Sequence, residues 1–156
     1  MLNVIAYLHR VHTRGIGVPV GYILFAGNGA GSTMSWKLWG LPPGPHGVHV
    51  HTFPCCRPGP DDTGKIIPAG TAGPHYDPDR TGSHRGPFGQ GHRGDLPRIL
   101  IDPTGQGEGA VFVPHLNTRE LPGRSVIFHA GGDTYSDTPK LGGGGARLAC
   151  GVFTLL

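Results

Sequence analysis

Histidine is the residue type that carries most of the chemistry in this sequence. The chain has 10 His in 156 residues, against only 3 Cys and 10 Asp plus Glu. Imidazole nitrogens suit copper and zinc, so grouped histidines indicate a metal site. Four histidines, His9, His12, His46 and His115, show no grouping. The six that do are His49, His51, His75, His84, His92 and His129.

The first group begins with His49 and His51 in the segment Gly-Val-His-Val-His. Residues i and i+2 of a strand project from the same face, so both rings could reach one ion while Val50 packs on the opposite side. Two surface histidines on a strand edge are the alternative. His129 ends a separate apolar segment. A third imidazole from a neighbouring strand would complete a nitrogen-rich site for copper or zinc.

The second group lies in a segment with almost no strand character. His75, His84, His92 and Asp95 fall within 21 positions of one another. Three imidazoles and a carboxylate form a four-coordinate set without an open position, which is typical of structural zinc. A bound metal would also order a loop that has no hydrophobic core of its own. A solvated polar loop is the alternative.

Cysteine and arginine add two further candidates. Cys55 and Cys56 are adjacent and Cys150 is distant, so at most one disulfide can form within the chain. It would close a loop of roughly 95 residues and contribute about 4 to 5 kcal/mol in the chain-entropy model. Three free thiols are the alternative. Arg147 follows four consecutive glycines; a lone Arg is most often a surface residue, but beside a metal it would attract small anions.

Short strands must position these residues, because no segment keeps a helical apolar rhythm free of Gly or Pro. The chain has 29 Gly and 16 Pro, which separate eight apolar segments. Eight short strands with turn residues between them indicate an all-β sandwich or barrel. The predicted strands are residues 2–12, 18–25, 33–38, 47–51, 98–101, 110–114, 125–129 and 147–155.

Two long connections between predicted strands hold most of the candidate residues. They are residues 52–97 and residues 130–146, and long structureless loops in compact domains are usually functional or disordered. The four glycines at 142–145 predict a turn in which the backbone passes close to another group.

Composition narrows the class of protein. A net charge of +3 and 15% charged residues argue against disorder, and the length favours a single domain over residues 1–156. Ten of the 13 basic residues are Arg and they are scattered, so we expect no nucleic-acid partner. No apolar run is long enough to span a membrane. Residues 1–13 lack a secretory signal pattern, which leaves a cytosolic protein or a mature exported chain.

Five segments in this order resemble the copper/zinc superoxide dismutases, over nearly the whole chain. The glycine-rich segments are most similar to the bacterial, exported branch. The matching segments are His-Gly-Val-His-Val-His (46–51), Ala-Gly-Pro-His-Tyr-Asp-Pro (72–78), Gly-Gln-Gly-His-Arg-Gly-Asp-Leu-Pro (89–97), Val-Ile-Phe-His-Ala-Gly-Gly-Asp (126–133) and Leu-Gly-Gly-Gly-Gly-Ala-Arg-Leu-Ala-Cys-Gly-Val (141–152).

The resemblance implies a fold, an activity and two metals. The fold is an eight-stranded Greek-key β-barrel, a flattened sandwich with two long functional loops. The activity is conversion of superoxide to dioxygen and hydrogen peroxide by a cycling copper, beside a structural zinc, one of each per chain. The implied copper ligands are His49, His51, His75 and His129. The implied zinc ligands are His75, His84, His92 and Asp95.

The resemblance also assigns roles to single residues. His75 is the shared, bridging ligand and supplies a proton, and Arg147 guides the anion; both are therefore catalytic. Asp133 is the carboxylate that links His49 to His84. The disulfide joins Cys56 to Cys150, Cys55 has no counterpart in the family pattern, and His46 is structural.

Two other functions compete with an active dismutase. One is a metal-binding or copper-delivery module on the same fold, and the other is a copper-only enzyme. The complete copper set with Arg147 opposes the first, and intact His84, His92 and Asp95 oppose the second. A disulfide favours an oxidising compartment, so we expect a periplasmic or otherwise extracytoplasmic protein. The resemblance implies superoxide as the substrate. It also allows a homodimer as the assembly.

Overall fold

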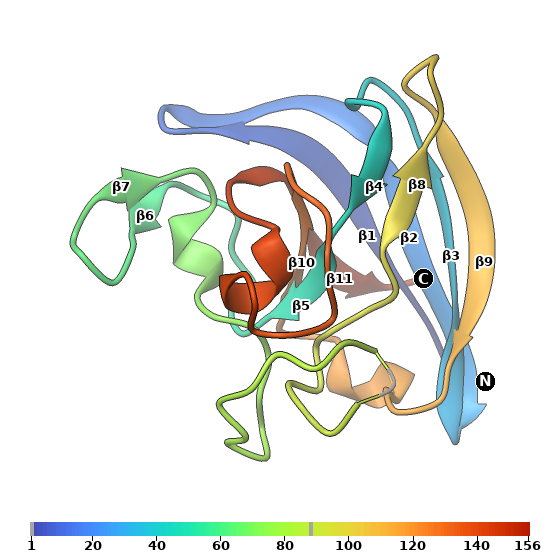
Figure 1. Ribbon diagram of the computed structural model, residues 1–156. Coiled ribbons are helices and arrows are strands. Elements are labelled where there is room, and N and C mark those ends of the chain that lie inside the picture. Colours follow the sequence, from blue (N-terminus) through green and yellow to red (C-terminus); the bar gives the residue numbers. More distant parts are fainter. Residues whose placement is uncertain (1, 88) are drawn as a thin grey trace.

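The computed structural model describes residues 2–87 and 89–156, and these form an all-β structure with three short 3-10 segments (Figure 1). No helix of the described residues is long and apolar enough to cross a membrane. The strands are β1 (Leu2–His12), β2 (Gly15–Gly29), β3 (Gly31–Leu38), β4 (Gly44–His46), β5 (Val48–His51), β6 (Gly59–Pro60), β7 (Ile66–Ile67), β8 (Ile99–Ile101), β9 (Gly107–Val113), β10 (Ser125–His129) and β11 (Arg147–Leu155). The 3-10 segments are η1 (Gly70–Ala72), η2 (Thr118–Glu120) and η3 (Lys140–Gly143).

Seven strands form one antiparallel sheet in the order β5-β10-β11-β1-β2-β3-β9. The sheet curls, as Figure 1 shows, and β4 and β8 form a short pair between its two edges. β4 runs into β5 through Gly47, and β8 turns into β9 with a hydrogen bond of 2.8 Å from Asp102 N to Gln106 O. The pairs β3–β9, β5–β10 and β1–β11 join strands that are distant in sequence. This Greek-key arrangement confirms the predicted eight-stranded barrel, with β4 and β5 as one interrupted strand.

The interior of the barrel is filled by alternating apolar residues of its strands. Ile23 and Phe25 of β2 and Met34 of β3 are fully buried, whereas the intervening side chains face outward. The two tryptophans also follow this alternation. Trp36 packs against the core, and Trp39, just past the end of β3, is 43% exposed.

Glycine accounts for the difference between the predicted and the observed start of β9. The predicted strand 110–114 begins earlier, as β9 at Gly107, and ends at Val113. At Gly109 the neighbouring strand brings the Trp36 indole so close that a Cβ would lie 2.6 Å from its ring. A glycine that reads as a strand breaker is therefore required here for close packing of β3 against β9.

Both long connections carry elements that the sequence did not predict. Residues 52–98 contain the two-residue pairing of β6 with β7 and the segment η1, and residues 130–146 contain η3. The two loops contact each other: His84 N donates to Asp137 at 3.1 Å, and Arg98 N donates to the Tyr135 hydroxyl at 2.9 Å. They meet beside β5 and β10, which carry three of the candidate histidines.

Candidate metal centre

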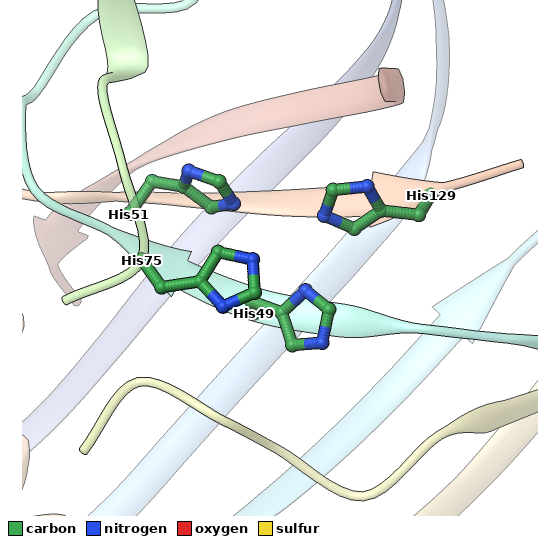
Figure 2. Close-up of side chains that lie close together, drawn as sticks. All are labelled: His49, His51, His75 and His129. Atoms are coloured by element: carbon green, nitrogen blue, oxygen red, sulfur yellow. The ribbon is translucent and has the colours of Figure 1, made fainter. Parts of the chain in front are cut away.

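Three elements bring four histidines face to face (Figure 2). His49 and His51 are on β5, where the strand places both rings on one side. His129 ends the neighbouring strand β10, and His75 follows η1 and forms a β-bridge with His51. One ring nitrogen from each lies within 4.8 Å of those of the other three, and all four side chains are buried. We call these four residues the first set: His49, His51, His75 and His129.

In three rings of the first set, one nitrogen is engaged by a neighbour. His51 Nδ1 donates to Gly73 O at 2.7 Å, and His129 Nδ1 donates to Gly145 O at 3.1 Å. His49 Nε2 donates to the Asp133 carboxylate at 2.9 Å. The opposite nitrogens, His51 Nε2, His129 Nε2 and His49 Nδ1, are buried without a hydrogen-bond partner. Three lone pairs therefore face one space, as a metal requires.

Burial keeps these imidazoles neutral. It lowers the pKa of His51 and of His129 well below the ordinary value for histidine, and neighbouring histidines add to the effect. Burial, followed by the charge of His49, lowers the pKa of His75 to about 3. Neutral imidazole is the form that binds metals, so the site is prepared to accept a cation without first losing protons.

A carboxylate organises the second group of candidate ligands. Asp95 Oδ1 lies 3.0 Å from His75 Nδ1 and 3.4 Å from His92 Nδ1, and its Oδ2 lies 2.8 Å from His84 Nδ1. His92 Nδ1 is also 3.2 Å from His75 Nδ1. The structure therefore brings together all the residues predicted for zinc. We call them the second set: His75, His84, His92 and Asp95.

His75 belongs to both sets. Its Nδ1 faces Asp95 and His92, which leaves Nε2 for the first set. His49 also approaches the second set, with a ligand-type atom within 4.8 Å of those of His75, His84 and Asp95. Because His49 Nε2 is engaged by Asp133 and its Nδ1 is unpartnered, we place His49 in the first set.

The electrostatics of the second set favour a cation. Burial alone would raise the pKa of Asp95, but its hydrogen bonds with His75 and His84 hold that pKa far below the usual range. Burial alone would lower the pKa of His84, but Asp133 and Asp95 raise it to about 9. Two ionised carboxylates around one ring create the negative potential that a divalent ion would neutralise.

Asp133 connects the two sets. Its Oδ2 accepts from His49 Nε2 at 2.9 Å, and its Oδ1 accepts from His84 Nε2 at 2.7 Å and from Tyr135 N at 2.8 Å. Asp133 is 4% exposed, and these donors hold the pKa of its carboxyl group well below the usual range against the effect of burial. The predicted link between His49 and His84 is thus present in the structure.

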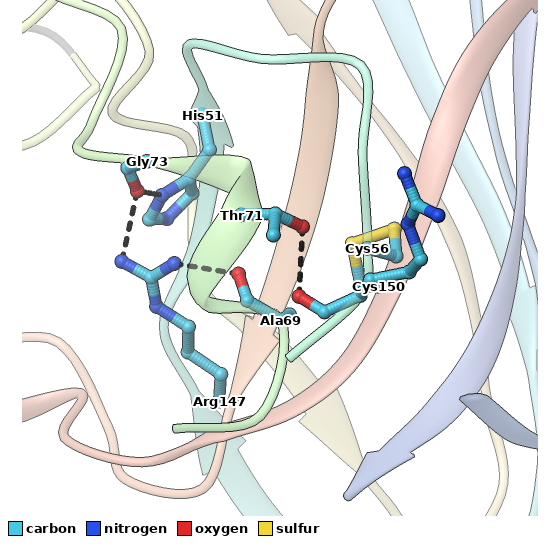
Figure 3. The surroundings of a disulfide bond; sticks show 8 residues. His51, Cys56, Ala69, Thr71, Gly73, Arg147 and Cys150 are labelled. Carbon is cyan, nitrogen blue, oxygen red and sulfur yellow. Dashed lines mark hydrogen bonds between the residues drawn. A yellow bond between two sulfur atoms is a disulfide. The ribbon is translucent and has the colours of Figure 1, made fainter. Parts of the chain in front are cut away.

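Arg147 lies beside the first set, at the start of β11 (Figure 3). Its guanidinium donates to Ala69 O at 2.9 Å and to Gly73 O at 2.8 Å, and Gly73 O also accepts from His51. Arg147 lines a cavity of about 680 Å³ into which His51, His75 and His129 also face. The cavity therefore joins solvent, a fixed positive charge and the first set.

A disulfide fixes the segment that holds Arg147 and His51. Cys56 and Cys150 are bonded, with their Cα atoms 5.7 Å apart, and Cys55 is a half-buried free thiol. Figure 3 shows the disulfide next to Ala69 and Thr71. This confirms the predicted pairing of Cys56 with Cys150.

His46 lies outside both sets. Its Nδ1 is 2.8 Å from His129 O and its Nε2 is 2.7 Å from Pro42 O, so both ring nitrogens contact backbone carbonyls and the role of His46 is structural.

The fold and the site together define a class: an antiparallel β-barrel whose long loops assemble two adjacent histidine-rich metal sites. A family model described as copper/zinc superoxide dismutase matches residues 20–153. The chain belongs to this family, whose activity is dismutation of superoxide with copper and zinc.

Bacterial relatives agree with this assignment. The chain is 49% identical over 140 residues to the superoxide dismutase [Cu-Zn] of Brucella abortus, covering 88% of this chain and 80% of that one. It is 42% identical over 147 residues to the superoxide dismutase [Cu-Zn] of Escherichia coli strain K12, covering 93% and 84%.

Solved structures show the same fold. The Cu/Zn superoxide dismutase of Brucella abortus superposes with a TM-score of 0.91 at 45% identity, covering 96% of this chain and 98% of that one. The copper, zinc superoxide dismutase of Salmonella enterica, described as monomeric, has a TM-score of 0.83 at 39% identity, covering 97% and 99%.

Proposed function

We propose that the first set binds copper and the second set binds zinc, one ion of each per chain, with His75 shared between them. One observation carries this assignment: buried, unpartnered nitrogens of His49, His51 and His129 converge, while the opposite nitrogen of each ring is engaged. A set of four imidazoles suits copper, and a set that includes the Asp95 carboxylate suits zinc.

The reaction passes one electron between two superoxide ions. One ion loses the electron and leaves as dioxygen; the other gains it, takes up two protons and leaves as hydrogen peroxide. Bound copper supplies this one-electron chemistry, and zinc, which is redox-inert, holds the loop and His75.

Arg147 binds the substrate anion, and His75 supplies a proton to it. Arginine has five N–H groups, and two of those of Arg147 are engaged by Ala69 O and Gly73 O, so the others are available to bind and orient an anion in the cavity. His75 Nε2 faces the first set, so it would be the copper-side ligand nitrogen of this ring and, whenever it is not bound to the metal, the atom that carries a proton to the second superoxide. Asp133 positions the rings of His49 and His84 and so couples the two sets.

We also propose one domain, residues 1–156, because β1 and β11 from opposite ends of the chain pair in the same sheet. The disulfide supports a periplasmic or otherwise extracytoplasmic location. All residues of both sets come from one chain, so a monomer and a homodimer are both compatible with the site.

Substitution of His129 tests the assignment of two separate metals. The variant His129→Ala removes a ligand of the first set only, so we expect loss of copper and of superoxide turnover with one zinc per chain retained. Elemental analysis and a superoxide-consumption assay measure both. His12→Ala, at an exposed histidine outside both sets, is the control and should keep both metals. Loss of zinc together with copper in His129→Ala would contradict two separable sites.

A further inference from the structure

The β6–β7 hairpin contributes acidic residues to the cavity that Arg147 lines. The acidic residues that line the cavity are Asp61 and Asp62, from this hairpin, and Asp77. Arg147 is the one Lys or Arg among the described lining residues. This composition is unexpected for a cavity that admits an anion, because like charge lowers the local concentration of an anion.

Two of these three carboxylates are engaged in local turns. Asp61 Oδ1 accepts from Thr63 N at 2.8 Å, from Thr63 Oγ1 at 2.7 Å and from Lys65 N at 3.0 Å. Asp77 accepts from Thr81 N at 3.0 Å and from Gly82 N at 2.8 Å. Their roles are therefore structural: they close the turns in which they lie.

Asp62 differs from both. Its side chain is exposed and has no hydrogen bond or ion pair with any described residue, so its charge serves no turn. The turn that Asp61 closes includes Asp62 and so holds it at the cavity. Asp62 is also the acidic group whose charge raises the pKa of Arg147, against the lowering by burial. The Asp62 carboxylate thus acts on the guanidinium that the substrate must reach.

We propose that Asp62 is a specificity-determining residue: its negative charge at the cavity filters anions on their way to Arg147. This rests on the anion-binding role proposed for Arg147. Coulomb repulsion is proportional to the charge of the incoming ion. A doubly charged anion such as hydrogen phosphate is therefore repelled about twice as strongly as superoxide. Asp62 therefore lowers the rate of superoxide capture, but it lowers the binding of divalent anions to the same guanidinium by a larger factor.

The expected sizes follow from Coulomb's law. We take the separation between the Asp62 carboxylate and the passing anion to be about one physiological screening length, ~8 Å; at that separation in water, one unit charge changes the capture of a monovalent anion by about twofold and that of a divalent anion by about fourfold. Both effects shrink as the ionic strength rises from about 0.01 M, where the screening length is about 30 Å, to about 0.15 M, where it is about 8 Å.

The test uses the full chain loaded with copper and zinc, in four variants and the wild type. Asp62→Asn removes the charge, and Asp62→Glu retains it. Glu108→Gln, at an exposed position of β9 that does not line this cavity, makes the same change in net charge. Arg147→Gln removes the anion-binding group. The readouts are the second-order rate constant for superoxide and, in the diamagnetic copper(I) form, the dissociation constant of inorganic phosphate from the NMR shift of the Arg147 Nε–H.

We expect Asp62→Asn at low ionic strength to react with superoxide about twofold faster and to bind phosphate about fourfold more tightly, with Asp62→Glu and Glu108→Gln close to the wild type. Equal effects of Asp62→Asn and Glu108→Gln, or equal effects of Asp62→Asn and Asp62→Glu, would overturn the filter and leave Arg147's role intact. An unchanged rate in Arg147→Gln, together with a wild-type Arg147 resonance that phosphate does not shift, would overturn both the filter and the anion-binding role of Arg147.

Discussion

Hydrogen-bond acceptors around the first set determine which nitrogen of each ring carries a lone pair toward the metal position. A carbonyl oxygen can only accept, so Gly73 O and Gly145 O require a proton on Nδ1 of His51 and of His129. The lone pair is then on Nε2, which faces the other histidines. The carboxylate of Asp133 does the same for His49 with the two nitrogens exchanged. The orientation and the tautomer of three rings are thus set by atoms outside the first set.

The surroundings of Cys55 predict the pH at which its thiol reacts with an alkylating reagent. Hydrogen bonds with the Thr71 side chain and then with Arg57 lower the pKa of Cys55 to about 7. We expect alkylation by iodoacetamide to be half-maximal near pH 7 in the native protein. In Thr71→Val the midpoint should rise toward about 8.5, the value of an unperturbed thiol. Mass spectrometry after timed alkylation gives the profile, with Cys55→Ser as the blank; a midpoint near 8.5 in the wild type would refute the assigned cause.

At the scale of elements, the glycine-rich segment after Pro139 is shaped by its neighbours. Gly142 has a φ of +77°, and a Cβ there would overlap the Asp133 carboxylate and lie 2.7 Å from His84 Nε2. At Gly144 a Cβ would lie 3.2 Å from the side chain of His129. This confirms the predicted close approach of the backbone: the segment covers the metal ligands so closely that side chains are excluded.

Gly142→Ala should therefore damage the site through Asp133. The added methyl group displaces the carboxylate from His84 and His49, and we expect affinity for both metals to fall about 10- to 100-fold. Competition with a chelator measures this. Gly123→Ala is the matched control, because Gly123 also has a positive φ, +86°, but has nothing within 4 Å of its Cβ position. An equal loss of metal affinity in the two variants would mean that backbone strain, and not the contact with Asp133, causes the loss.

Residue type and spacing are enough to predict much of the site. His49 and His51 are separated by the two-residue period of a strand, and the eight candidate strands and both long loops are visible from apolar runs between Gly and Pro. The carbonyls of Gly73 and Gly145 leave no such signal, because every residue has a carbonyl. The β6–β7 pairing and the position of Asp62 are also invisible, since they depend on how a Pro- and Gly-rich loop folds over the barrel.

At the scale of the whole molecule, the barrel and the disulfide together make the site rigid. Strands β5 and β10 are paired neighbours, so His49, His51 and His129 are fixed by the sheet itself. His75 and the carbonyls that hold Arg147 come from the loop, and the disulfide, with a sequence separation of 94, ties that loop to β11. The loop-derived half of the site depends on this covalent link.

Removal of the disulfide tests this dependence. In the chain-entropy model a loop of this length contributes about 4 to 5 kcal/mol. We expect Cys56→Ser/Cys150→Ser to lower the Tm by roughly 10 °C or more. Superoxide turnover should fall as well, because Arg147 loses its fixed acceptors. Calorimetry and the activity assay measure the two effects. Cys55→Ser should match the wild type, and an equal loss of stability in that variant would contradict the assigned pairing.

The most direct test of the two-metal account is the metal content of the chain, measured together with its activity. The metal-free protein is reconstituted with copper and zinc, dialysed, and analysed for both elements beside a superoxide-consumption assay. The account predicts one copper and one zinc per chain with fast turnover. Both metals bound without turnover would contradict it and would leave a metal-binding module on the same fold.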